Sequence, residues 1–318
     1  MVWIFGSPRT GSTWLLELLA HPLLLEARDP LGFRAPADLD RPADVLPINE
    51  SALPTHLMPP QPEDPPARQR PWIRVPADTF GDVASYFFSN RFEDVWRPGI
   101  RALAHARFGA HLKRAAATHL VRDDALVVIK EPNGSHAAPL IMSLLPDARL
   151  LFLYRDGRDV VDSLLALTAP GGLAAMWRGV AVETPEQRVE LIREESLNWV
   201  ARITATERAY QQRPAELRWR LRYEDLLADP TSCLEGLAGW LGLERDATEI
   251  AEAVEAKAFG AAGQAPTGAS ATRRAGIPGL WRENLSKRES ELAHEIMGEK
   301  LAELGYLEAP HARVRASS

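Results

Sequence analysis

The sequence predicts an α/β fold in which a mainly parallel β-sheet is flanked by helices. Three short apolar runs have the length and composition of buried strands: 2–5, 125–129 and 149–154. Each is followed by a turn that contains glycine and then by a stretch with helical periodicity: 13–20, 136–145 and 159–167. Strands that alternate with helices over short connections form parallel sheets, and ligands bind beyond the carboxyl ends of those strands.

Local patterns predict the remaining elements. Residues 86–117 are mostly helical in pattern, and Pro98 is expected to break this helix. A long amphipathic helix is expected at 186–212, and a last helix begins at a Ser-x-x-Glu capping box at 286–289. Residues 217–223 alternate strictly between large apolar residues and arginines, which predicts a strand near a sheet edge with the arginines on a solvated face.

The chain is expected to form one domain, residues 1–318, with a proline-rich insert at about 30–76. Twelve of the 25 prolines lie in this insert. Because proline removes a backbone donor and breaks helices, we expect irregular structure there. The insert is either a surface linker or a lid over a substrate site, since long loops within one domain often serve as lids.

The composition excludes several classes of protein. A net charge of −6 gives the chain no general attraction for nucleic acid or anionic membranes, so an anionic ligand needs positive charge gathered locally. The one cysteine, Cys233, excludes a disulfide framework and a multi-cysteine metal site. No apolar run reaches the roughly 18 residues of a transmembrane helix, and the N-terminus lacks a signal-peptide pattern. We therefore expect a cytoplasmic protein without bound metal, and a homodimer is left open.

The first chemical motif is the segment Gly6-Ser7-Pro8-Arg9-Thr10-Gly11-Ser12-Thr13-Trp14, which follows a strand and opens a helix. Its two glycines let the backbone curl, so that successive N–H groups and the helix N-terminus hold a phosphate. The segment resembles the Walker A loop, G-x-x-x-x-G-K-[ST], but Ser12 replaces the lysine and Arg9 supplies the cation. This replacement favours a phosphate-bearing donor other than a nucleoside triphosphate with Mg²⁺.

Residues 154–163, with the sequence Y-R-D-G-R-D-V-V-D-S, predict a second anion site. Arg155 stands at the carboxyl end of a strand, and its planar guanidinium suits bidentate binding of phosphate. Ser163 reaches the same phosphate only if the loop folds back over the strand end. Arg158 is expected to form an ion pair with Asp162, four residues later on the helix.

These motifs resemble those of the sulfotransferases that use 3′-phosphoadenosine-5′-phosphosulfate (PAPS). Residues 6–15 are similar to the family's 5′-phosphosulfate loop, and residues 154–163 to its 3′-phosphate motif. Residues 274–282 resemble a late R-K-G-x-x-G-D-W-K segment, and residues 223–226 match a Y-E-D-L element whose tyrosine lies near adenine. The four blocks occur in the family's order. Arginine at position 9 resembles carbohydrate, tyrosylprotein and several bacterial members.

The resemblance implies the sulfotransferase fold and transfer of a sulfuryl group from PAPS, without a metal, to a hydroxyl or amine of a small-molecule acceptor. It implies that Arg9 stabilises the leaving phosphate. Trp14 either stacks on adenine or belongs to the core. The other residues that the resemblance implies at the PAPS site are Ser7, Pro8, Thr10, Gly11, Ser12, Thr13, Arg155, Ser163, Tyr223, Arg274 and Gly276.

The acceptor hydroxyl needs a base. The family's K-T-H-L-P pattern, which carries a histidine base, is replaced here by K-E-P-N-G at 130–134, so the base is expected elsewhere. In relatives with arginine in the loop, a carboxylate shortly after the first helix serves. This makes Asp29 the first candidate and Glu26 the second. Glu131 is the third, because it ends a strand at the correct edge.

The proline-rich insert and residues 168–185 are expected to wall the acceptor site. Six aromatic residues either line an apolar pocket there or fill the core: Trp72, Phe80, Tyr86, Phe87, Phe88 and Trp177.

Two other functions stay open from the sequence. One is a P-loop kinase or nucleotidase with a variant phosphate loop, which would prefer ATP with Mg²⁺ to adenosine 3′,5′-bisphosphate. The other is a catalytically silent nucleotide-binding protein. The presence of Arg9 argues against the silent protein, which has no use for a cation at the transferred group.

Overall fold

The computed structural model describes residues 1–25, 33–36, 39, 41–51, 53–57, 90–170, 182–257 and 277–307. The chain divides into two compact units. The first contains residues 1–155 and 201–277, and the second contains residues 156–200 and 278–318. The interpretation as one domain with an insert stays a prediction, and the six aromatic residues expected at the acceptor site lie outside the described residues.

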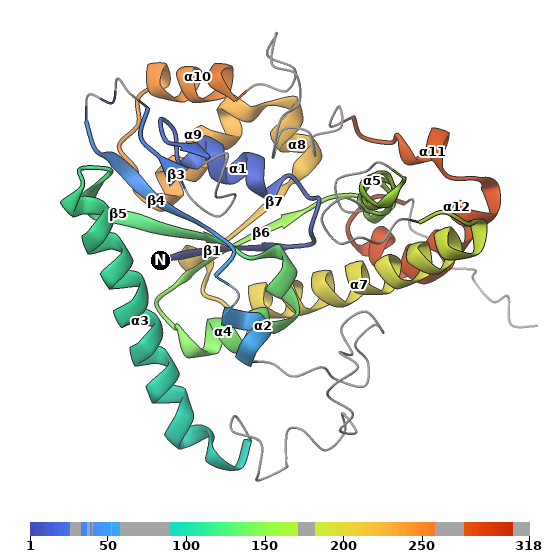
Figure 1. Cartoon of the computed structure of the whole chain (residues 1–318), viewed down its shortest axis with the longest axis horizontal. Helices are drawn as coiled ribbons and strands as arrows, with labels where there is room; N and C mark the ends of the chain where they lie inside the picture. The colour runs from blue at the N-terminus through green and yellow to red at the C-terminus, as the bar shows by residue number, and fades with distance from the viewer. Residues whose placement is uncertain are drawn as a thin grey trace, which may run out of the picture. The chain divides into compact units, whose positions relative to one another are not determined.

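The first unit is built on a five-stranded sheet with the order β4-β5-β1-β6-β7, in which every neighbouring pair is parallel (Figure 1). Its strands are β1 (Val2–Gly6), β4 (Ala43–Asn49), β5 (Val121–Lys130), β6 (Arg149–Tyr154) and β7 (Arg218–Arg222). This arrangement confirms the predicted α/β class. The strand predicted at 217–223 is also confirmed at a sheet edge, where β7 covers 218–222.

Helices cover both faces of this sheet. Figure 1 shows α1 (Ser12–Leu19), α9 (Pro230–Leu241) and α10 (Ala247–Ala256) over one face, and α3 (Glu93–Ala117) and α4 (Ala138–Leu144) over the other. Shorter elements complete the unit: β2 (Leu24–Leu25), β3 (Phe33–Arg34), α2 (Leu53–Leu57), η3 (Asn90–Phe92), η4 (Pro132–Ala137), η5 (Ala215–Leu217) and α8 (Tyr223–Ala228). Within the described residues, no helix combines the length and apolar composition needed to cross a membrane.

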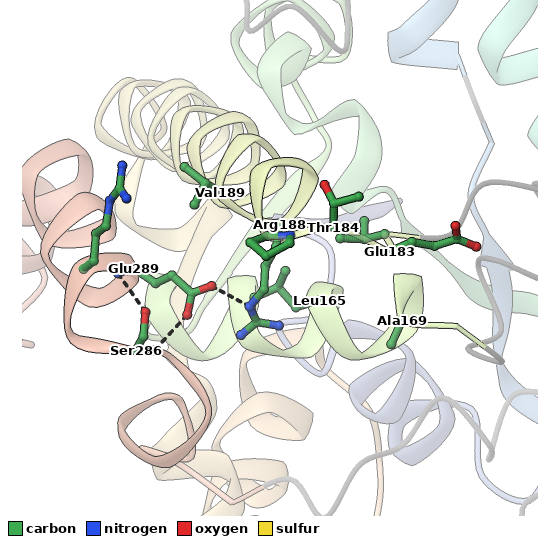
Figure 2. A pocket seen from close by; sticks show the side chains of 11 residues that line it. Leu165, Ala169, Glu183, Thr184, Arg188, Val189, Ser286 and Glu289 are labelled. Atoms are coloured by element: carbon green, nitrogen blue, oxygen red, sulfur yellow. Dashed lines mark hydrogen bonds and ion pairs between the residues drawn. The ribbon is translucent and has the colours of Figure 1, made fainter.

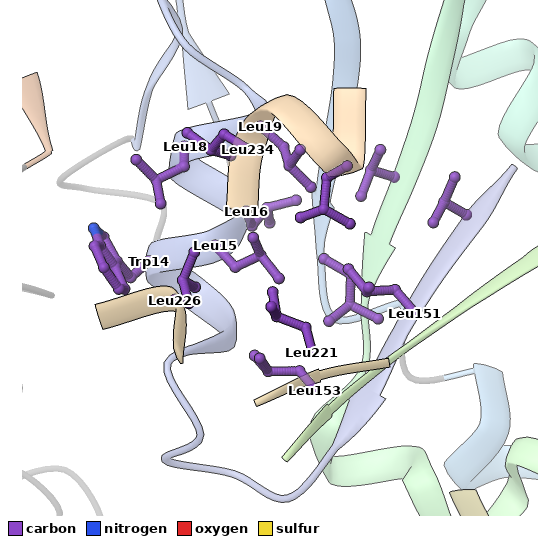
Figure 3. Packing of buried hydrophobic residues seen from close by; sticks show 14 of the residues in the cluster. Trp14, Leu15, Leu16, Leu18, Leu19, Leu151, Leu153, Leu221, Leu226 and Leu234 are labelled. Carbon is purple, nitrogen blue, oxygen red and sulfur yellow. The ribbon is translucent and has the colours of Figure 1, made fainter. Parts of the chain in front are cut away.

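Packing on both faces fixes the central strand β1. Side chains of a strand alternate between the two faces, so Val2 and Ile4 join a cluster with the leucines of α1, shown in Figure 3. On the other face Trp3 packs edge-on against Phe108 of α3, with ring centroids 5.9 Å apart. Because Val2, Trp3, Ile4 and Phe5 are all fully buried, the loop that follows Gly6 begins from a rigid position.

The second unit contains α5 (Gly157–Thr168), the first part of α7 (Pro185–Gln211), α11 (Trp281–Asn284) and α12 (Lys287–Glu303). The carboxylate of Asp159 accepts hydrogen bonds from the backbone N–H groups of Gly279 and Trp281, at 2.8 and 3.3 Å. The predicted capping box is confirmed, because Ser286 and Glu289 cap each other at the start of α12. The two hydrogen bonds to Asp159 tie the segment that begins α11 to α5.

The prediction of irregular structure throughout residues 30–76 is wrong for the short elements β3 and α2 and, above all, for 43–49. These residues form the edge strand β4, in which Val45 and Leu46 are buried and Pro47 lies opposite Val128. Proline is tolerated in an edge strand because its missing N–H faces away from the sheet. Residues 58–76 lie outside the described residues.

The predicted helix break at Pro98 is also wrong, since α3 continues through this residue. Pro98 is near the start of a 25-residue helix, so only the first turns feel the missing N–H and the crowding of its ring. Trp96 is buried in the same turns, and its apolar burial offsets the lost hydrogen bond.

Candidate functional site

The predicted phosphate loop lies between β1 and α1, at the carboxyl end of the central strand. Two of its residues adopt left-handed backbone conformations, Arg9 with a φ of 69° and Gly11 with a φ of 79°. The hydroxyl of Thr10 donates to the carbonyl oxygen of Ser7 at 2.8 Å and closes the turn. The chain therefore curls sharply before it enters the helix, as an anion-binding turn requires.

The ring of Tyr223 packs against this loop at Gly11. A Cβ atom on Gly11 would lie 2.6 Å from two ring carbons of Tyr223, so glycine alone fits this close approach. The tyrosine is 1% exposed and meets Trp14 edge-on. Trp14 is itself buried in the core cluster, and its indole N–H donates to the carbonyl oxygen of Lys257 at 2.9 Å. Contact of either ring with adenine stays a prediction.

Two guanidinium groups lie beside the loop, that of the partly buried Arg9 and that of the buried Arg155. Arg155 follows β6, donates to the carbonyl oxygen of Arg9 at 3.3 Å, and sits 4.5 Å from the ring centre of Tyr223. Burial lowers the pKa of Arg9 to about 10, with a further contribution from the charge of Arg155 that outweighs the opposing effect of Tyr223. Placing two like charges together in a buried site is costly, and a bound anion removes that cost.

A buried hydroxyl in the same loop also points to a ligand. The Oγ atom of Ser7 is inaccessible to solvent and has no hydrogen-bond partner among the described residues. Buried polar groups are almost always hydrogen-bonded, so an orphan of this kind needs an explanation. A phosphate or sulfate oxygen at the loop would supply the missing partner.

Lys130 is a candidate that sequence reasoning missed. It is the last residue of β5, and its buried ammonium group donates to Thr13 Oγ1 at 3.3 Å and to Glu50 Oε1 at 3.1 Å. Burial is the main cause that lowers the pKa of Lys130, and the attraction of Glu50 and Glu131 opposes it. Its position was readable, because carboxyl ends of neighbouring parallel strands meet at one edge.

The candidate bases fall into two groups. Asp29 and Glu26 lie outside the described residues. Glu131 is 1% exposed and accepts a hydrogen bond from the Ser51 hydroxyl at 2.7 Å. The structure adds a further carboxylate at the same edge, Glu50, which follows β4.

The second anion motif is divided between the two units. Arg155 belongs to the first unit, and Ser163 lies buried on α5 of the second. Arg274 and Gly276 lie outside the described residues. Joint binding of one phosphate by these residues therefore stays a prediction.

The expected ion pair of Arg158 with Asp162 is wrong. Arg158 instead donates to both carboxylate oxygens of Asp156, at 2.9 and 2.7 Å. Asp156 caps the N-terminus of α5 and stands two residues away, where its two oxygens match the guanidinium fork. Asp162 accepts from the side chain of Asn284 at 3.1 Å.

Each unit contains a cavity. One of about 1130 Å³ in the first unit is lined by residues at the starts of β4 and β5, such as Ala43 and Arg122, so it lies at the opposite end of the strands from the loop. The other, of about 420 Å³, lies in the second unit and is lined by Ala169 and 182–185, beside the ion pair of Arg188 with Glu289 (Figure 2). These lining residues belong to a predicted wall of the acceptor site.

Similarities to known proteins are found with a family model and with solved structures. A family model described as "Sulfotransferase family" matches residues 2–247. The structure of mouse sulfotransferase SULT7A1 complexed with PAP is similar over 94% of this chain and 84% of that chain, at 13% identity and a TM-score of 0.51. Sulfotransferase STF9 from Mycobacterium avium is similar over 95% and 76%, at 16% identity and a TM-score of 0.46. Curated protein sequences give no match.

Proposed function

This chain belongs to the sulfotransferase family, and we propose that it transfers a sulfuryl group from PAPS to a hydroxyl group of a small molecule. The observation that carries the proposal is the pair of guanidinium groups, from the partly buried Arg9 and the buried Arg155, beside a curled loop at the start of a helix. A nucleotide with phosphates at both its 3′ and 5′ positions supplies anions to both arginines and a partner to the orphaned hydroxyl of Ser7. The mouse protein with the similar fold was crystallised with PAP, and this ligand class is carried over as part of the proposal.

Arg9 acts on the charge that develops during transfer. When the bond between sulfur and the bridging oxygen breaks, negative charge builds up on the leaving phosphate. A guanidinium held in place by the loop stabilises that charge without reorganisation, and burial strengthens the attraction. Lys130 adds a second cation at Thr13, the residue that follows the loop on α1.

Arg155, with Ser163 and Arg274, holds the 3′-phosphate in this proposal. The acceptor hydroxyl gives its proton to a carboxylate, for which Asp29, Glu26 and Glu131 are the candidates from the sequence. The acceptor itself is a small molecule that enters beside residues 168–185. Their described ends line the cavity of the second unit, which supports this part of the proposal.

Ligand preference tests the function directly. Titration calorimetry with adenosine 3′,5′-bisphosphate in the absence of metal should show binding, and ATP with Mg²⁺ should bind at least about tenfold more weakly, because the loop lacks the Walker lysine. The protein should also transfer the labelled sulfuryl group of PAPS to at least one member of a panel of alcohols and phenols. Tighter binding of ATP with Mg²⁺ would instead identify a kinase or nucleotidase.

Replacement of Arg155 by alanine should weaken binding of adenosine 3′,5′-bisphosphate about 10- to 100-fold, since a hydrogen bond to a charged group is worth roughly 1.5–3 kcal/mol. Calorimetry measures this affinity, and Arg220→Ala is the matched control. Arg220 is an exposed arginine of the edge strand β7, stacked on Tyr154, and its loss should leave the affinity unchanged. Equal affinities of the Arg155 variant and the native protein would remove this residue from the donor site.

A further inference from the structure

A hydrogen-bonded cluster joins the ends of β4 and β5 to the start of α1. We call it the Glu50 cluster, and it consists of Thr13, Glu50, Lys130 and Asn133. Lys130 Nζ bridges Thr13 Oγ1 and Glu50 Oε1, and Asn133 Nδ2 donates to Glu50 Oε2 at 2.7 Å. The Glu50 carboxylate therefore lies no more than two hydrogen-bond lengths from Thr13, at the mouth of the phosphate loop.

The backbone of Glu50 is held in an unfavourable conformation. Its φ is 68°, in the left-handed region that residues other than glycine rarely adopt. Its backbone N–H donates to the carbonyl oxygen of Lys130 at 2.8 Å, which fixes this turn at the end of β4. Such conformations cost free energy and persist at functional sites, where they aim a side chain in a required direction.

The exposure of the two partners differs in a way that matters for chemistry. The Lys130 side chain is 6% exposed and the Glu50 side chain is 30% exposed. Each carboxylate oxygen of Glu50 accepts one hydrogen bond from the protein and keeps a second lone pair. Glu50 is thus oriented by buried and fixed groups but remains open to an arriving molecule, whereas Glu131 beside it is sealed from solvent.

We propose that Glu50 is the proton acceptor of the transfer reaction. The inference rests on the proposed function and deepens it. The acceptor oxygen forms a bond to sulfur while the bond between sulfur and the bridging oxygen breaks, and that electron pair stays on the nucleotide phosphate. The acceptor proton moves to a carboxylate oxygen of Glu50 and leaves to water after product release. Lys130 and Asn133 position the carboxylate for this step.

The test compares Glu50→Gln with Asp124→Asn, which removes an equal charge from an exposed carboxylate near the start of β5, at the opposite end of the strand from Lys130. Transfer is followed with radiolabelled PAPS, both to water and to every alcohol or phenol that the native protein uses. Glu50→Gln should lower these rates about 10²-fold or more, the usual contribution of a positioned base. The affinity of Glu50→Gln for adenosine 3′,5′-bisphosphate should stay within about twofold of the native value, and Asp124→Asn should keep native activity.

Chemical rescue separates proton transfer from a structural role. Formate should raise the transfer rate of Glu50→Ala at least about tenfold over the rate of the same variant without formate. The small carboxylate can enter the space of the missing side chain and accept the proton. Absence of rescue in a folded variant that still binds the bisphosphate would overturn the proposal. Near-native rates in Glu50→Gln, or a loss confined to Asp29→Asn or Glu26→Gln, would overturn it as well.

Failure of the proposed function looks different from failure of this inference. If the native protein neither binds the bisphosphate nor consumes PAPS, the proposed function is wrong and the role of Glu50 falls with it. If the native protein transfers sulfate and Glu50→Gln does so equally well, the function stands and only this role is wrong.

Discussion

Replacement of Arg9 by alanine is expected to lower the rate of sulfuryl transfer about 10²- to 10³-fold and to leave the protein folded. Loss of one fixed donor to a developing oxyanion typically has this effect. The rate is measured at saturating PAPS, so that weaker donor binding does not account for the loss. Arg9→Lys should retain more activity, because it keeps the charge but not the planar fork that matches a phosphate.

The same substitution should not destabilise the protein. Because burial and Arg155 lower the pKa of Arg9 to about 10, the charged side chain is less stable in the folded chain than in the unfolded chain. This penalty is on the order of 3 kcal/mol. It is fully present below about pH 10, and it disappears as the pH rises toward the ordinary pKa of arginine. The melting temperature of Arg9→Ala at neutral pH is therefore expected to equal or exceed that of the native protein.

Two outcomes would contradict the role of Arg9. Near-native transfer by Arg9→Ala would show that the leaving phosphate is stabilised by other groups. A large drop in melting temperature would show that the arginine supports the fold, since its removal should relieve the repulsion from Arg155. Arg220→Ala is the control for both measurements.

Local sequence patterns predicted the elements whose residues carry the signal themselves. The run at 149–154 forms β6 with the predicted bounds, because a short apolar run that ends at a turn is typical of a strand buried on both faces. The turn at 6–11 was predicted because glycine spacing and polar residues between a strand and a helix are local features. In both cases the decisive residues are neighbours in the chain.

Elements that depend on distant residues were missed. β4 was not predicted, because the prolines around it indicate irregular structure and the sequence does not show that Pro47 lies at a sheet edge. The Glu50–Lys130 pair joins residues 80 positions apart. Lys130 follows a predicted strand, but Glu50 follows β4, which was not predicted, so no local pattern brings the two together. Arg158 pairs with Asp156 rather than with Asp162, and Asp162 accepts a hydrogen bond from Asn284, 122 positions further along the chain.

The contacts of Tyr223 in the structure differ from the adenine contact that its motif implies by resemblance. The Y-E-D-L element places this tyrosine near adenine by resemblance, while the structure places its ring against Gly11 and Arg155. Because the ring packs against both groups, it holds the turn at Gly11 and the guanidinium of Arg155 in place. The motif can therefore serve the donor site by shaping it, whether or not the ring contacts the base.

Replacement of Gly6 by alanine is expected to destabilise the first unit by more than about 4 kcal/mol, which is exceptional for a single methyl group. Gly6 is the last residue of the central strand and pairs with Leu153 of β6. A Cβ atom at this position would lie 2.0 Å from the carbonyl oxygen of Leu153. The obstacle is backbone within a parallel pair, so no side-chain rotation relieves it, and β1 must move away from β6.

The separation of these two strands should also disrupt the donor site, because the phosphate loop begins at Gly6 and Arg155 follows β6. Thermal unfolding should show a melting temperature lower by roughly 10 °C or more, at about 2–4 °C for each kcal/mol. Gly109→Ala is the matched control. A Cβ atom on this glycine of α3 meets no described atom within 4 Å, and alanine in a helix is favoured over glycine by roughly 1 kcal/mol, so this variant should be slightly stabilised. If Gly6→Ala melted within about 2 °C of the native protein and still bound the bisphosphate, the strand register that carries both arginines to one loop would have to be wrong.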